Sequence, residues 1–173
     1  GFIEKCQQTI DKIARSSTHI GVIIGAPGLN NDTKGKNLFN AAYFLSEGKV
    51  LAIQNKTLLP TYDIFDEYRY FEPNTTFSVI NYKGLKIALT ICEDLWDNVS
   101  VDSSFKRQKL YKVSPIEELI KQKPNLLINI AASPFSYTNE EIKKELLISK
   151  AGKYKVPIIY VNQTGAQTEL IFG

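Results

Sequence analysis

The sequence predicts an α/β protein in which a mixed sheet system is layered as a sandwich and covered by helices. Segments with helical spacing of apolar residues alternate along the chain with short apolar runs typical of buried strands. The glycine-containing connections Glu47-Gly48 and Lys83-Gly84 each separate two such runs, which is a hairpin signal. Residues 85–92 carry apolar side chains on one face and mostly uncharged ones on the other, which indicates burial on both sides of the sheet.

The N-terminal half is expected to begin with an amphipathic helix over residues 2–16, where apolar positions recur at helical spacing. A buried strand follows over residues 19–26 and is expected to end at Pro27-Gly28. The two hairpins pair residues 40–46 with 49–55 and residues 77–82 with 85–92. Between them lies an irregular segment, residues 58–71, whose many aromatic side chains either fill the core or line a substrate pocket.

The C-terminal half is expected to begin with a long polar loop over residues 97–113. Pro115 is favoured at the first position of a helix, which should extend to Gln122. The sequence Thr138-Asn139-Glu140-Glu141 resembles a capping box, which predicts a helix ending near Tyr154. Three further strands are expected, at residues 126–131, 156–162 and 168–172.

Length and composition limit the classes of function. A chain of 173 residues suits a single domain, expected over residues 1–173. Its 21 basic and 18 acidic residues are interleaved and give a net charge of +3, which argues against a nucleic-acid partner. No apolar run reaches the roughly 18 residues of a membrane span, and no signal peptide pattern occurs at the start. Two cysteines are too few for a disulfide framework, so a cytoplasmic location is expected.

Cys92 is the first candidate for chemistry. It ends a predicted strand and directly precedes Glu93-Asp94-Leu95-Trp96. A side chain at such a junction can project into a cleft while the strand holds it, and the next backbone N–H can point toward an oxyanion. A nucleophilic cysteine also needs a base or a positive charge nearby. From its position alone, a buried and inert cysteine is the commoner explanation.

Lys56 follows the predicted strand 49–55 and is the second candidate. A lysine fixed beside a thiol lowers the pKa of that thiol and stabilises an oxyanion, whereas a lone lysine at a strand end is usually a solvated surface charge. No Walker-type or dinucleotide-binding glycine motif occurs, and no Cys/His spacing predicts a metal site. No cofactor is therefore expected in this chain.

Three segments together resemble a known family. The segment Asn55-Lys56-Thr57-Leu58-Leu59-Pro60-Thr61-Tyr62, continued to Phe71, is similar to the lysine segment in the glutaminase domain of glutamine-dependent NAD synthetases. Ile91-Cys92-Glu93-Asp94-Leu95-Trp96 resembles the nucleophile segment of that domain, and residues 160–172 resemble its closing strands. The segments occur in the same order and extend through nearly the whole chain.

This resemblance implies a carbon-nitrogen hydrolase domain with the α-β-β-α sandwich of the nitrilase superfamily, incomplete at its N-terminus. It also implies a Glu-Lys-Cys triad in which Cys92 is the nucleophile and Lys56 is the lysine. Positions that match the family's glutamine contacts are Tyr62, Ser133 and the backbone of Glu93. A basic residue often follows the family's serine by six positions, but Asn139 stands there, so it is only a weak candidate for a substrate contact.

The implied reaction is hydrolysis of the glutamine amide through a cysteine thioester. In the full-length enzyme the released ammonia would serve the ATP-dependent amidation of deamido-NAD to NAD. ATP, Mg²⁺ and deamido-NAD would then belong to a C-terminal synthetase domain of the same polypeptide, and a homo-oligomer is expected. L-Glutamine is the expected partner of this chain, with no nucleic acid and no membrane.

The expected general-base glutamate has no match, because the family's Pro-Glu-Leu segment does not occur. The chain is therefore expected to be a piece of a longer polypeptide and inactive by itself, with Glu67 the first residue to mutate if it nevertheless hydrolyses glutamine. Two alternatives remain: another nitrilase-type amidase, or a non-catalytic nitrilase-like assembly module.

Overall fold

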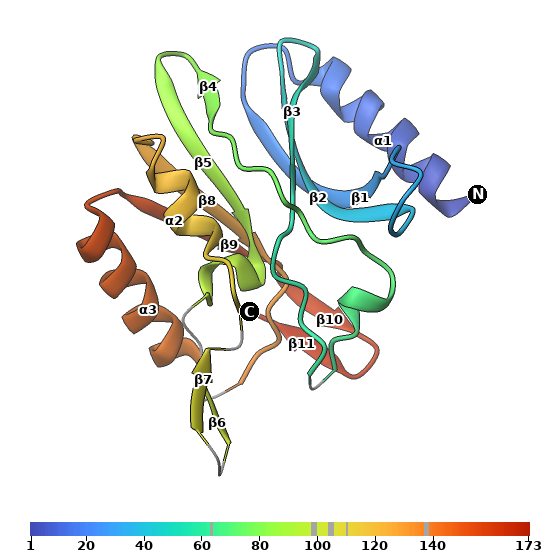
Figure 1. The fold of residues 1–173 in the computed structure, drawn as a ribbon. Helices are drawn as coiled ribbons and strands as arrows, with labels where there is room; N and C mark the ends of the chain where they lie inside the picture. Colours follow the sequence, from blue (N-terminus) through green and yellow to red (C-terminus); the bar gives the residue numbers. More distant parts are fainter. Residues whose placement is uncertain (63, 98–99, 104–105, 110, 137–138) are drawn as a thin grey trace. The chain divides into compact units, whose positions relative to one another are not determined.

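A computed structural model describes residues 1–62, 64–97, 100–103, 106–109, 111–136 and 139–173, without the side chains of 100–103, 106–109 and 139. The chain divides into two compact units, Gly1–Thr76 and Phe77–Gly173, whose elements are labelled in Figure 1. None of the helices in the described ranges is long and apolar enough to cross a membrane.

The unit Gly1–Thr76 contains one helix and a three-stranded sheet. Helix α1 (Phe2–Ser16) confirms the predicted amphipathic helix. Its sheet has the order β1-β2-β3, all antiparallel, with β1 at Val22–Leu29, β2 at Leu38–Ser46 and β3 at Lys49–Asn55. The predicted β2–β3 hairpin is confirmed, and positive φ angles at Glu47 (55°) and Gly48 (75°) suit the twist of a two-residue hairpin turn.

Strand β1 differs from its prediction. It begins at Val22 rather than residue 19 and continues through Pro27-Gly28, which were expected to end it. Because β1 is an edge strand of its sheet, Pro27 can lack a donor without breaking the pairing with β2. The carbonyl of Pro27 is also used, since it accepts hydrogen bonds from Gln7 Nε2 (2.7 Å) and Tyr43 Oη (3.2 Å).

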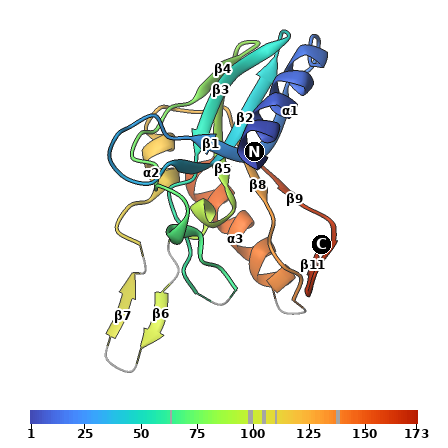
Figure 2. The same cartoon turned by 90° about the vertical axis from the view of Figure 1, so that its right-hand side faces the viewer.

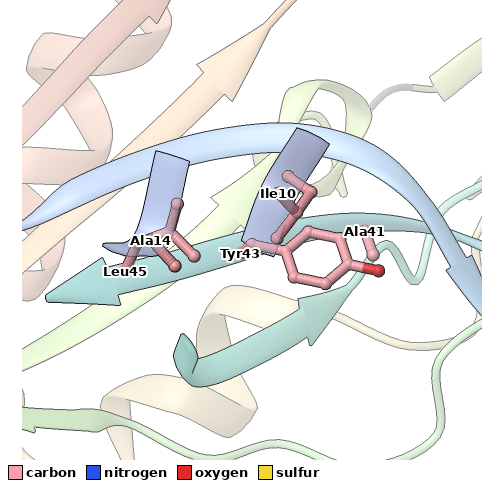
Figure 3. Close-up of a cluster of buried hydrophobic side chains, with 5 residues drawn as sticks. All are labelled: Ile10, Ala14, Ala41, Tyr43 and Leu45. Atoms are coloured by element: carbon pink, nitrogen blue, oxygen red, sulfur yellow. The ribbon is translucent and has the colours of Figure 1, made fainter. Parts of the chain in front are cut away.

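Helix α1 is held on this sheet by a buried apolar cluster. Figure 3 shows its members side by side: Ile10, Ala14, Ala41, Tyr43 and Leu45. The helix residues are four positions apart and the β2 residues two apart, so each set lies on one face of its element. The periodicity read from the sequence therefore identifies the packed faces correctly.

The unit Phe77–Gly173 contains a four-stranded sheet in the order β4-β5-β8-β9. Its strands are β4 (Ile80–Tyr82), β5 (Leu85–Ile91), β8 (Leu126–Ala131) and β9 (Ile158–Asn162). The β4–β5 pair is antiparallel, as the predicted hairpin requires, whereas β5, β8 and β9 run parallel. Buried residues from Ile87 to Ile91 confirm that β5 is covered on both faces.

Two helices cover one face of this sheet. Helices α2 (Pro115–Ile120) and α3 (Asn139–Tyr154) contribute to one apolar cluster with Ala88 and Leu127, and Figure 2 gives a second view of them. The Ser114 side chain caps α2, accepting a hydrogen bond from Glu117 N (3.2 Å), and Pro115 follows as its first residue, as predicted. Helix α2 ends at Ile120, two residues before its predicted end, and Thr138 of the expected α3 capping box lies outside the described residues.

Two short hairpins were not predicted. The expected loop 97–113 contains β6 (Ser100–Ser103) paired with β7 (Lys106–Lys109), and the C-terminal segment contains β10 (Gly165–Gln167) paired with β11 (Leu170–Phe172). Strands β6, β7 and β10, of three or four residues each, lack the apolar alternation on which a strand prediction depends, whereas β11 falls within the predicted strand 168–172. Strands β9 and β11 also begin two residues later than predicted.

Candidate active site

Three polar residues of the unit Phe77–Gly173 lie at or just beyond the carboxyl ends of its parallel strands. Cys92 directly follows β5, Ser133 lies two residues beyond β8, and Asn162 is the last residue of β9. Since parallel strands place their carboxyl ends at one edge of the sheet, this edge is where a ligand site is expected in an open α/β sheet.

Cys92 adopts a conformation that is unusual for a residue with a side chain. It is the first residue of a short 3-10 helix (Cys92–Leu95), its φ angle is +45°, and its side chain is half-buried. A non-glycine residue in the left-handed region costs on the order of 1–3 kcal/mol and is concentrated at functional sites. The strained turn therefore supports a functional role for Cys92 over that of an inert core cysteine.

Neighbouring side chains hold this turn in place. The Asp94 carboxylate accepts a hydrogen bond from the backbone N–H of Ile91 (3.2 Å). Asn129, which is paired with Thr90 in the sheet and fully buried, donates to Thr90 Oγ1 (2.9 Å) and to the backbone carbonyl of Cys92 (3.4 Å). Because that carbonyl belongs to the same peptide plane as the Glu93 N–H, Asn129 restricts the direction of the expected oxyanion donor.

Tyr160 is hydrogen-bonded to the Ser133 side chain and lies near Cys92. It lies beside Asn129 in the sheet, on the face that α2 and α3 cover. Burial raises the pKa of Tyr160 to about 12, the nearby Cys92 adds to the rise, and a hydrogen bond with the Ser133 side chain partly offsets it. The phenol is thus protonated at neutral pH, close to both residues.

Asn162 fixes the backbone of Ser133. Its Oδ1 accepts from the backbone N–H of Ser133 (2.8 Å), and its Nδ2 donates to the carbonyl of the same residue (3.0 Å) and to that of Gly173 (2.9 Å). One side chain therefore satisfies both backbone groups of Ser133. Further along the same loop, Pro134 bridges to Phe172 and the Phe135 N–H donates to the Ile171 carbonyl (2.7 Å).

The Glu93 side chain is turned into the protein. It is 6% exposed, and one of its carboxylate oxygens accepts a hydrogen bond from Tyr111 Oη at 2.8 Å. The role that the sequence assigned to Glu93 belongs to its backbone N–H, and the buried carboxylate anchors the turn that carries this group.

Lys56, in the unit Gly1–Thr76, is buried rather than solvated. It is 1% exposed, and its backbone N–H and carbonyl are fixed by Asn40 O (2.8 Å) and Asn74 N (3.0 Å). Its Nζ lies 2.5 Å from Glu67 Oε1, and the other oxygen of Glu67 accepts from Asn40 Nδ2 (3.0 Å). The solvated-surface explanation is therefore wrong, and Lys56 is a buried, oriented cation.

The remaining predicted glutamine contacts are Tyr62 and Asn139. The Tyr62 ring is 44% exposed and packs edge-on against Phe65, with the ring centroids 6.2 Å apart. Asn139 begins α3, but its side chain lies outside the described part of the structure.

Sequence reasoning missed several residues of this site. Those that gain a role from the structure are Asn129, Tyr160 and Asn162. In the unit Gly1–Thr76, Glu67, which the sequence named only as the first residue to mutate, is the ion-pair partner of Lys56. The first three stand at strand positions that look like ordinary core, and only the pairing of β8 with β9 aligns them with Cys92 and Ser133.

Known proteins resemble this chain over nearly all of its length. The sequence profile of the carbon-nitrogen hydrolase family matches residues 4–110. A glutamine-dependent NAD(+) synthetase of Synechocystis sp. is 38% identical over 175 residues, which cover 99% of this chain and 31% of that protein. One from Thermotoga maritima is 29% identical over 171 residues, covering 99% of this chain and 27% of that protein. The chain thus spans less than a third of the length of either relative.

Solved structures give the same result for the fold. A glutamine-dependent NAD+ synthetase from Acinetobacter baumannii superimposes with a TM-score of 0.81 at 28% identity, covering 98% of this chain and 29% of that one. A variant amidase of the nitrilase superfamily from Nesterenkonia gives a TM-score of 0.74 at 19% identity, covering 98% and 58%. The predicted nitrilase-type α/β fold is confirmed. With the family profile matching more than half of its residues, the chain belongs to the carbon-nitrogen hydrolase family.

Proposed function

We propose that this chain carries the site at which a longer polypeptide hydrolyses the side-chain amide of L-glutamine, with Cys92 as the nucleophile. The observation that carries the proposal is the strained left-handed turn that presents Cys92 at the carboxyl edge of the sheet, close to Tyr160 and Ser133. The relatives that align with 99% of the chain are named for their dependence on glutamine.

The reaction is proposed to proceed in two steps. The Cys92 thiolate attacks the amide carbon, and the backbone N–H of Glu93 donates to the resulting oxyanion. The C–N bond then breaks, the nitrogen takes up a proton and leaves as ammonia, and a thioester remains. Water attacks the thioester, which releases glutamate and restores the thiolate.

Lys56 is proposed to supply the positive charge that this chemistry needs. Its burial and its fixed backbone support the assignment, because a cation held in place costs little reorganisation when charge develops. Glu67 orients the ammonium group through the 2.5 Å contact. Ser133 and Tyr62 are proposed as glutamine contacts, whereas Asn139 stays a weak candidate.

The ammonia is proposed to feed the ATP-dependent amidation of deamido-NAD in a longer polypeptide. This extension rests on the names of the relatives, of which the chain aligns with 31% and 27%. ATP, Mg²⁺ and deamido-NAD would bind a synthetase domain of that polypeptide rather than this one, and self-association is part of the same proposal.

The test is glutamate release from L-glutamine by the full-length polypeptide and by its Cys92→Ala variant. Release should fall to background in the variant, because the proposed thioester forms on the Cys92 thiol. NAD formation from added ammonia by the full-length polypeptide should continue, which separates loss of the nucleophile from loss of folding. Glutamine use that persists without Cys92 contradicts the proposal.

A further inference from the structure

Asn129 of β8 supports the nucleophile turn at the end of the neighbouring strand β5. The sheet register places it beside Thr90, two residues before Cys92. Its Nδ2 donates to Thr90 Oγ1 (2.9 Å) and to the backbone carbonyl of Cys92 (3.4 Å). Asp94 holds the turn from within, through the N–H of Ile91, whereas Asn129 holds it from another strand.

The side-chain amide of Asn129 is satisfied at its nitrogen but not at its oxygen. The residue is 0% exposed, and of the buried side-chain nitrogen and oxygen atoms in the described ranges, Asn129 Oδ1 alone has no hydrogen-bond partner. A buried acceptor without a partner costs free energy, which an apolar side chain of the same branched shape, such as leucine, avoids. The Nδ2 donors that reach the nucleophile turn are therefore what distinguishes asparagine from an apolar residue at this position.

Thr90 determines which end of the amide faces the turn. Its hydroxyl donates to the carbonyl of Ile128 (3.4 Å), so its lone pairs are left to accept from Asn129 Nδ2. A reversed amide would bring Asn129 Oδ1 against the carbonyl oxygen of Cys92, and two acceptors repel each other. The observed orientation is thus the one that both neighbours favour.

We propose that Asn129 is a positioning residue for the proposed glutamine hydrolysis: by fixing the Cys92–Glu93 peptide, it directs the Glu93 N–H toward the oxyanion. The inference rests on the proposed function and adds to it a residue that acts through the backbone. A peptide plane is rigid, so a restraint on its carbonyl also restrains its N–H. The φ angle of +45° at Cys92 lies in a sparsely populated region, which persists only where the surroundings hold it.

Steady-state glutamate release by the full-length polypeptide is the first measurement. Asn129→Leu should lower kcat roughly tenfold to a hundredfold, which is part of the effect of losing an oxyanion donor outright. KM for L-glutamine should change less than about twofold, because the substrate contacts are kept. Thr90→Val keeps the shape of Thr90 but removes the acceptor for Asn129 Nδ2, so it should cause a smaller fall in kcat.

Two electrophiles separate oxyanion stabilisation from the reactivity of the thiol. Iodoacetamide alkylates Cys92 by displacement of iodide, and no oxyanion forms. p-Nitrophenyl acetate acetylates the same sulfur through a tetrahedral oxyanion, whose ester C–O bond then breaks to release p-nitrophenolate. Asn129→Leu should slow acetylation about tenfold and leave the alkylation rate and its pH profile unchanged. A distorted turn would instead slow both reactions.

Asn125→Leu is the matched control. Asn125 also bonds a backbone group of β5, since its Oδ1 accepts from the N–H of Lys86 (2.8 Å), but this contact lies at the end of β5 opposite Cys92. The control should change neither kcat nor either modification rate. Circular dichroism and NAD formation from added ammonia should show that each variant is folded.

The outcomes distinguish this inference from the proposed function. Unchanged kcat and acetylation in Asn129→Leu overturn the inference, even where glutamate release depends on Cys92. Equal losses in acetylation and alkylation indicate a displaced thiol and also overturn it. Selective loss of acetylation in a polypeptide that releases no glutamate upholds the role of Asn129 and overturns the proposed function. Where Asn129→Leu does not fold, Thr90→Val takes its place, and acetylation at the original rate in that variant overturns the inference.

Discussion

At the scale of single residues, the Lys56–Glu67 pair is the most informative feature of the unit Gly1–Thr76. A lysine with 1% exposure costs free energy unless its charge is compensated, and Glu67 supplies that compensation at 2.5 Å. The exposed Lys49–Glu47 pair, with its charged atoms 3.8 Å apart, has no comparable constraint. The buried pair is therefore a candidate for function and the exposed one is not.

Replacing Lys56 should slow the chemistry of Cys92. If Lys56 favours the thiolate, Lys56→Ala should reduce the rate of Cys92 alkylation at neutral pH and shift the pH–rate profile to higher pH. Iodoacetamide modification followed by mass spectrometry from pH 5 to 10 measures both effects. Lys49→Ala is the matched control, since it removes an exposed lysine from the adjoining strand.

A second variant keeps this result interpretable. Lys56→Ala leaves the Glu67 carboxylate without its cation, so Lys56→Ala combined with Glu67→Gln removes the charge imbalance as well. Slow alkylation in both variants supports a role for the lysine itself. If the pH–rate profile of alkylation is identical to that of the protein without substitutions, Lys56 does not act on the thiol.

At the scale of elements, the last residue of β9 holds the loop after β8 in position. Asn162 bonds both backbone groups of Ser133, so the loop position depends on the last residue of a neighbouring strand. Asn162→Ala should raise KM for L-glutamine several-fold with a smaller fall in kcat, because Ser133 loses its orientation while Cys92 keeps its own supports. Steady-state glutamate release gives the two constants separately.

Two companion variants complete the Asn162 experiment. Asn162→Asp keeps an acceptor for the Ser133 N–H but loses the donor to the Ser133 and Gly173 carbonyls, so it should give an intermediate KM. Asn81→Ala, at an exposed position of β4, should change neither constant. A proportional fall in kcat alone, with KM constant, contradicts a positioning role.

Elements with a strong apolar periodicity or with specific turn residues could be predicted from the sequence. Elements whose bounds depend on pairing with a neighbouring strand could not. Strand β8 was predicted with its observed bounds, and both glycine hairpin turns are present. The extension of β1 through Pro27 depends on its edge position, which no local pattern shows. Cys92 and Lys56 were found by motif, but the burial of Lys56 and the supports of Cys92 come from contacts between distant segments.

At the scale of the whole molecule, one buried carboxylate joins several elements that are far apart in the sequence. Within the unit Phe77–Gly173, the Asp97 carboxylate lies just after the Cys92 turn and is fully buried. It contacts Lys150 of α3 and the hydroxyl of Ser114, the residue that caps α2. One carboxylate therefore connects the nucleophile turn to both helices.

Removing the cation of this network should strongly destabilise the protein. Lys150→Met keeps most of the side-chain volume but leaves the Asp97 charge buried without its cation, which typically costs about 3–5 kcal/mol. Urea unfolding followed by circular dichroism measures the loss, and Lys153→Ala, on the exposed face of α3, should cost little by comparison. Lys150→Met combined with Asp97→Asn should recover part of the loss, because the remaining amide carries no charge and can still bond to Ser114. Equal destabilisation in the single and double variants would show that the loss comes from packing around α3 rather than from an uncompensated charge.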